Sequence, residues 1–276
     1  MANSVNTNFG ATVALQSLNK TNRELDMVQK RVSTGFRVSD AKDDGASFAV
    51  AQGLRADVKG NEAVNERLSV AKGLLAVTQE SLKGISTTIG DIKKVVVKLA
   101  DDSLSTDERA QYVADYAALT ADITKYKDQA TFGGKNLLTA AATTNVISDA
   151  SGGVIALTGI NVATGLTAMG TTAQGTAATN ILQLGSGAQT YTIEKFEKII
   201  NDQIASVGAS MRTVENQDNF IKVLGDTIND AIGAIVDADL AKESAKLQAL
   251  QIRQQLGTQT LSIANQSPSI LLSLFQ

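Results

Sequence analysis

Apolar residues recur at alternating intervals of four and three residues from Val64 to Leu99, in a series in which only Thr78 is polar. This spacing brings each apolar side chain back to the same side of an α-helix and is typical of helices that pack along a seam. A helix over 64–99 would be about 54 Å long at ~1.5 Å per residue, which is long for a compact globular domain. The repeat therefore predicts an extended bundle whose core row contains Leu68, Leu75, Leu82, Ile85, Ile89, Ile92 and Val96.

A second apolar series runs from Ile193 to Ile235, with one extra step of four, and extends the predicted core row. It contributes Ile221, Ile228 and Ile235. Between the two series, Ser105-Thr106-Asp107-Glu108 has the pattern of a capping box and predicts the start of a third helix. We therefore expect a mainly α fold: a long antiparallel coiled-coil or helical-bundle rod built from both chain ends, with a small β and loop excursion in the middle.

The excursion is expected at residues 139–192, where Gly, Ala, Thr and Ser are frequent. Within it, the runs Val154–Leu157 and Ile181–Leu184 have the composition of short strands. Just before it, Phe132-Gly133-Gly134-Lys135 predicts the turn that ends the helical part.

The residue types that the chain lacks exclude most enzyme classes. It has no Cys and no His, which removes thiolate chemistry, disulfides, the Ser-His-Asp triad and most zinc sites. Asp43-Asp44-Gly45 lacks the spaced ligands of a calcium loop, and Asp237-Ala238-Asp239 stands without a glycine-rich loop for a nucleotide. We predict no enzymatic activity, no catalytic residue, no cofactor and no metal site.

Charge and hydropathy limit the partners as well. The net charge of -3 does not favour nucleic acid. The apolar runs are too short to span a membrane. The N-terminus lacks the basic and apolar segments of a secretory signal peptide, so a chain that leaves the cell would need another route.

The predicted helix at each chain end carries two neighbouring apolar rows. If the two helices pair with each other, one row of each helix is buried and the second row remains uncovered. We expect that second row to be exposed in a monomer and to drive assembly. Asn22, Gln29 and Gln254 lie on or near these rows, where buried polar residues fix register. The residues predicted to form the inner helices are Leu15, Leu18, Leu25, Val28, Val32, Leu247, Leu250, Ile252, Leu256, Leu261, Ile263, Leu271, Leu272 and Leu274.

The stretch RVSTGFRVSDAKDDGASFAV, residues 31–50, separates two helical segments. Gly35 and Gly45 frame the break, and Asp43 or Asp44 is placed to cap the helix that follows. In the same way, Asp237 or Asp239 is placed to cap the last helix. We expect a connector with subunit contacts through Arg31, Gly35, Arg37, Asp43 and Asp44.

Motifs at both ends resemble those of the bacterial flagellins. Arg31-Val32-Ser33-Thr34-Gly35 and Ala41-Lys42-Asp43-Asp44 are similar to the family's RLSTG and AKDD patterns. Asp237–Glu243 resembles its DADxAxE motif, and Gln254-Gln255, Ala264-Asn265-Gln266 and Leu271–Leu274 follow at the family's spacing. The resemblance covers about 140 residues at one end and about 85 at the other.

The resemblance implies a structural subunit that polymerises into the flagellar filament for swimming motility. It implies an inner coiled coil from residues 1–44 and 237–276, and a rod from residues 45–236 whose short outer region, 139–192, faces solvent. In the family this outer region can carry O-linked sugars. The resemblance also implies an extracellular location, reached through the flagellar type III channel without a cleaved signal peptide.

The implied partners are other copies of the chain or flagellin paralogues, the hook-associated junction and cap proteins, the export apparatus and an export chaperone. Asp91 stands where flagellins recognised by the animal innate immune receptor have a key Arg, so we expect weak or no activation of that receptor. Two alternatives stay open: a hook–filament junction protein of the same superfamily, and a generic coiled-coil adaptor.

Overall fold

The computed structural model describes residues 8–101, 103–141, 143–166 and 193–273, with side chains described as far as residue 266. Its helices are α1 (Phe9–Thr34), α2 (Gly45–Leu99), α3 (Thr106–Gln129), α6 (Ile193–Val236) and α7 (Leu240–Ser273), and its strands are β1 (Thr143–Ile147) and β2 (Val154–Thr158). The mainly α class predicted from the sequence is confirmed. The chain divides into two compact units: a three-helix unit, residues 59–226, and a terminal unit, residues 1–58 and 227–276.

The three-helix unit buries the heptad rows of α2 and α6 against each other and against α3. Tyr116 and Ile123 of α3 pack into the same cluster as Phe196 and Ile200 of α6. The predicted row of α2 lies inside it, with Leu68, Leu75, Leu82, Ile85, Ile89, Ile92 and Val96 all buried. One continuous apolar core therefore runs through this unit.

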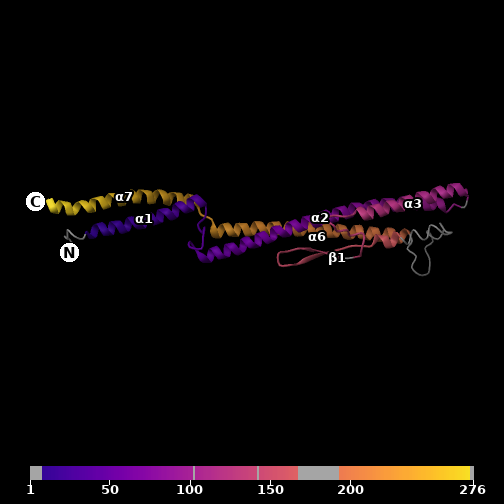
Figure 1. Cartoon of the computed structure of the whole chain (residues 1–276), viewed down its shortest axis with the longest axis horizontal. Helices are drawn as coiled ribbons and strands as arrows, with labels where there is room; N and C mark the ends of the chain where they lie inside the picture. The colour runs from indigo at the N-terminus through magenta and orange to yellow at the C-terminus, as the bar shows by residue number, and fades with distance from the viewer. Residues whose placement is uncertain (1–7, 102, 142, 167–192, 274–276) are drawn as a thin grey trace. The chain divides into compact units, whose positions relative to one another are not determined.

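The strands form a two-stranded antiparallel hairpin along α6 (Figure 1). Leu157 is buried in the core, and two glutamines of α6 hold the ends of the hairpin. Gln217 donates to the carbonyl of Ser148 at 2.7 Å, and Gln203 donates to that of Thr158 at 2.9 Å. The predicted strand at 154–157 is thus confirmed, whereas the one at 181–184 lies outside the described residues.

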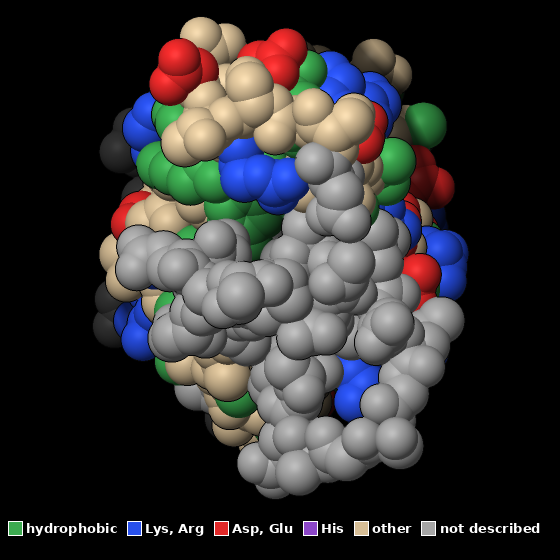
Figure 2. Space-filling model, turned by 90° about the vertical axis from the view of Figure 1, so that its right-hand side faces the viewer, with side chains coloured by type: hydrophobic (Ala, Val, Ile, Leu, Met, Phe, Trp, Pro, Cys, Tyr) green, Lys and Arg blue, Asp and Glu red, His purple; other side chains and the backbone are tan. Residues whose placement is uncertain are grey.

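The predicted capping box opens α3. The Ser105 hydroxyl accepts from the backbone N–H of Glu108, whose carboxylate accepts from the N–H of Ser105 at 3.0 Å. Arg109 then donates to the carbonyls of Leu99 at 2.8 Å and Asp101 at 2.9 Å, which satisfies carbonyls at the end of α2. Around this end of the unit, acidic, basic and hydrophobic side chains are interspersed on the described surface (Figure 2).

The structure differs from the sequence prediction where the two long helices cross from one unit into the other. The heptad repeat predicted a helix from Val64, but α2 begins at Gly45. The compact units divide at 58/59 and 226/227, inside the two long helices, and the division of the subunit at 44/45 and 236/237 stays a prediction. Of the predicted rod-core residues on α6, Ile221 is in the three-helix core, Ile228 is half-buried, and Ile235 packs in the terminal unit. On α6 the apolar series continues through the division at 226/227, so there it carries no signal of where one core ends.

Candidate functional site: the terminal helix pair and its connector

Helices α1 and α7 lie side by side in the terminal unit (Figure 1). Asn8 caps α1, since its side-chain oxygen accepts from the N–H of Ala11 at 3.0 Å, while its amide donates to the carbonyl of Ala264 on α7 at 2.7 Å. At the other end, Gly35 terminates α1 with a φ of 76°, a left-handed conformation that glycine adopts without strain. One residue at each end therefore fixes the extent of α1.

One apolar row of each helix forms the seam of this helix pair. Leu25 and Val28 pack against Leu250, and Val32 and Leu247 cover the contact. Leu18 is half-buried and lies against Gly257. A Cβ added at Gly257 would lie 3.2 Å from a methyl group of Leu18. Two of the predicted polar seam residues meet: the Gln254 amide donates to the Asn22 side-chain oxygen at 2.8 Å.

The other predicted apolar row of the pair is exposed. Leu15 on α1 is 47% exposed, and on α7 Ile252, Leu256 and Ile263 are 58%, 56% and 70% exposed. Leu261 is half-buried. Leu271 and Leu272 belong to α7 but lie beyond the described side chains, and Leu274 lies outside the described residues. We define the exposed row as Leu15, Ile252, Leu256 and Ile263.

The connector consists of residues 35–44 and 236–239, which run beside each other. Phe36 and Asp237 form an antiparallel bridge. The N–H groups of Arg37 and Val38 donate to the carbonyl of Val236 at 2.7 and 3.2 Å, and Ala238 donates to that of Gly35 at 2.9 Å. The Arg37 guanidinium donates to the carbonyl of Ile235.

Beneath the connector, a small core forms in which Val38, Ala51 and Val236 are buried and Phe48, Ile232 and Ile235 pack around them. The connector is therefore an ordered piece of structure with its own apolar support.

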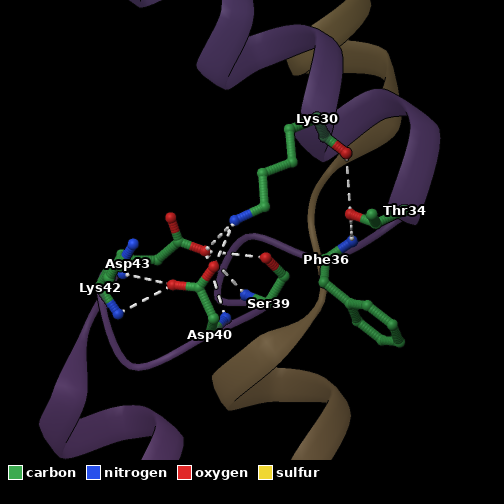
Figure 3. Close-up of polar contacts among 7 residues, drawn as sticks. All are labelled: Lys30, Thr34, Phe36, Ser39, Asp40, Lys42 and Asp43. Carbon is green, nitrogen blue, oxygen red and sulfur yellow. Dashed lines mark hydrogen bonds and ion pairs between the residues drawn. The ribbon is translucent and has the colours of Figure 1, made fainter.

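Carboxylates organise the turn inside the connector (Figure 3). One oxygen of Asp43 accepts from the N–H and hydroxyl of Ser39 at 3.0 and 2.9 Å, and from the Lys30 ammonium at 3.2 Å. The hydrogen bonds from Ser39, with that from Lys30, lower the pKa of Asp43 to about 2. Lys30 also pairs with Asp40 at 2.7 Å, so one ammonium ties α1 to two points of the turn.

Two further aspartates start the helices that leave the connector. Asp44 accepts from the N–H groups of Ala46 and Ser47, both at 3.1 Å, and caps α2. Asp239 accepts from the N–H groups of Ala241 and Lys242, at 3.0 and 3.1 Å, and caps α7. The sequence predicted either Asp43 or Asp44 as the cap of α2 and either Asp237 or Asp239 as the cap of α7. In both pairs, the aspartate nearer the helix is the cap.

Arg31 and Glu243 link the end of α1 to the first turn of α7. Their side chains are only 23% and 12% exposed and approach to 3.2 Å. The Nε of Arg31 and the second carboxylate oxygen of Glu243 are buried without a hydrogen-bond partner among the described residues. The pair therefore lies in a poorly hydrated place, where losing either partner leaves a charge uncompensated.

The predicted connector residues all make contacts within the chain. Arg31 pairs with Glu243, Arg37 binds a carbonyl, Gly35 ends α1, Asp43 organises the turn and Asp44 caps α2. Their part in contacts between subunits stays a prediction. Sequence reasoning missed Lys30, because it pairs with residues ten and thirteen positions away across a turn, a spacing with no periodic signal.

Among the described residues, no group of three or more acidic side chains is placed to hold a metal ion. Nor does any helix among them combine the length and apolar character that crossing a bilayer requires.

Comparison with known proteins identifies the family of the chain. Residues 5–143 match the bacterial flagellin N-terminal helical region, and residues 191–275 match the bacterial flagellin C-terminal helical region. The chain is 36% identical to Flagellin FljM and 39% identical to Flagellin FljN of Caulobacter vibrioides, in each case over 99% of both chains. It is 33% identical to a flagellin of Brucella melitensis, again over 99% of both.

Proposed function

The chain belongs to the bacterial flagellin family and is a structural subunit of the flagellar filament, and from this premise we propose that its exposed row is the surface through which subunits assemble. The observation that carries the proposal is the exposure of Ile252, Leu256 and Ile263 on a helix whose other face is already paired. Burial of an Ile or Leu side chain contributes about 1.5–3 kcal/mol. A few such contacts in each subunit, repeated through a lattice, favour polymer over monomer.

The parts of the chain have different places in the proposed filament. The helix pair, with residues 1–44 and 237–276, forms the inner coiled coil, and residues 45–236 form the rod outside it. Residues 139–192 form the short outer region. The two family matches support the proposed outer region alone, because they leave residues 144–190 unmatched, in the segment proposed to vary and face solvent.

The route and partners follow from the same premise. We propose an extracellular filament whose subunits pass through the flagellar type III channel and assemble with copies of themselves or with paralogues. The junction and cap proteins and an export chaperone complete the set of partners. The role is mechanical, and we assign no enzymatic activity to the chain.

Truncation of purified protein after Leu256 tests the proposal, since it removes Ile263 and the rest of α7. Electron microscopy should show no filaments, while circular dichroism shows that the three-helix unit remains folded. The control is full-length protein carrying Gln251→Ala, an exposed polar position of α7, which should polymerise normally. Normal filaments from the truncated protein would refute the proposal. Short collars from full-length protein would favour the junction protein instead.

A further inference from the structure

Asp218 interrupts the apolar row of α6 inside the three-helix unit. It is 2% exposed and lies in the heptad series between Val214 and Ile221, both of which are buried in the core. It is the one charged residue that is buried among the described residues of this unit. A carboxylate at such a position has a cost in desolvation, so its presence calls for a compensating role.

Two lysines neutralise this carboxylate, and they come from different helices. Lys72 reaches it from α2 at 2.7 Å, and Lys222 reaches it from one turn further along α6 at 2.8 Å. Hydrogen bonds from Lys222 and Lys72 hold the pKa of Asp218 below its usual value, so the group is charged at neutral pH. Both lysines bind the same oxygen, while the other is buried without a partner among the described residues.

The two lysines respond differently to axial sliding of α2 against α6. Lys222 moves with Asp218 because both are on α6. Lys72 does not: a slip of one heptad replaces it with Asn65 (72 - 7) or Gln79 (72 + 7), neither of which is a cation. The apolar row alone specifies the register weakly, because Leu68, Leu75 and Leu82 repeat at the heptad interval. The Lys93–Glu197 ion pair also joins α2 to α6, but each of its side chains is 36% exposed, so it constrains the register less than a buried pair does.

From this arrangement we infer that the Asp218–Lys72 pair sets the axial register of α2 against α6. A buried polar contact is a weak source of stability and a strong source of register specificity, as single polar residues in coiled-coil seams are. The native register is the one that gives the buried carboxylate its cation from the second helix.

Spin-label distances test the inference directly, and the absence of Cys in the chain makes labelling clean. The labels are placed at Thr87→Cys on α2 and Ser206→Cys on α6, two exposed polar positions. The parent protein should give one distance. With Asp218→Leu, a second distance should appear, because a slip of one heptad changes the axial offset of the labels by about 10 Å. The denaturation midpoint of Asp218→Leu should be equal to or above that of the parent.

The two lysines supply the matched control. Lys72→Met should give the same second distance as Asp218→Leu, because it removes the cation that comes from α2, whereas Lys222→Met should keep the single parent distance, although both remove one cation from the same oxygen. Lys72→Met combined with Asp218→Leu should give the same two distances as Asp218→Leu alone. The inference is overturned if Asp218→Leu keeps a single distance at the parent value, or if Lys222→Met gives the second distance as strongly as Lys72→Met.

Discussion

The three-helix unit and the terminal helix pair use the same kind of apolar repeat and differ in how much of it they bury. In the three-helix unit, Leu82, Ile85 and Ile89 are fully covered within the chain. In the helix pair, Leu25, Val28 and Leu250 are covered, but Ile252 and Ile263 are not. A row that has a partner within the chain serves folding, and a row without one is available for assembly.

The largest expected effect is a loss of stability caused by a substitution in the core of the three-helix unit. Ile89→Ala should lower the free energy of unfolding by about 2–5 kcal/mol, because it leaves a cavity among residues that cannot close around it. Chemical denaturation followed by circular dichroism measures the loss. Val97→Ala on the same helix, at a position 59% exposed, is the control and should cost little. Equal losses at the two positions would contradict the proposed division between covered and exposed rows.

Substitutions in the exposed row should weaken polymerisation and leave the stability of the monomer nearly unchanged. Ile252→Ser and Leu256→Ser should each raise the critical concentration for polymerisation about tenfold or more, because each removes about 1.5–3 kcal/mol of burial in the lattice. Monomer unfolding should be nearly unchanged, since both side chains are exposed in the monomer. Sedimentation across a concentration series gives the critical concentration, with Gln251→Ser as the polar control. A lower unfolding midpoint without an assembly defect would place these residues in the monomer core.

A smaller effect is expected where the helix pair meets its connector. Glu243→Gln should cost about 1–3 kcal/mol, because it leaves the half-buried Arg31 guanidinium without a carboxylate. Hydrogen exchange at the end of α1 and the first turn of α7 would localise the loss. The exposed pair Lys198–Asp202 is the reference: Asp202→Asn should have almost no effect. Unchanged exchange in Glu243→Gln would mean that the ion pair does not hold the two helix ends together.

The smallest effect should appear on acidification. The pKa of Asp43 is lowered to about 2 in the folded chain, so its contribution to stability is complete above its unfolded pKa of about 3.9. That contribution is lost as the pH falls from about 4 toward 2, because the protonated acid no longer binds Ser39 and Lys30 as a carboxylate does. Asp43→Asn should flatten this part of the stability profile, measured by thermal unfolding. A profile with the same slope in parent and variant would exclude Asp43 as its source.

Periodicity predicted the helices and the side that each one buries. The rows through Leu68 and Leu250 could be recognised because an apolar side chain every three or four residues has one simple solution, a helix face against a partner. Local chemistry predicted the helix starts in the same direct way: Ser105 with Glu108 opens α3, as the capping box required. These features depend on residues close together in the chain.

Contacts between distant residues could not be predicted in this way. The pairing of Arg31 with Glu243, or of Lys72 with Asp218, depends on how the helices fold back on each other, and a single charge has many candidate partners along the chain. The limits of the two compact units were hidden for a related reason. Helix α6 keeps its apolar repeat through the division at 226/227, so there the change from one core to the next lies in the partners and not in the pattern.

The connector has a mechanical consequence for a subunit of a filament. The helix pair is joined to α2 and α6 by two strands of the same chain, and three backbone hydrogen bonds at Arg37, Val38 and Ala238 tie those strands together. A pull on the helix pair is shared between two covalent paths that carry the load in parallel, and the hydrogen bonds keep the two paths side by side. Twisting the helix pair about the connector must therefore distort both segments and the bonds between them, a resistance that a single freely rotating strand could not offer.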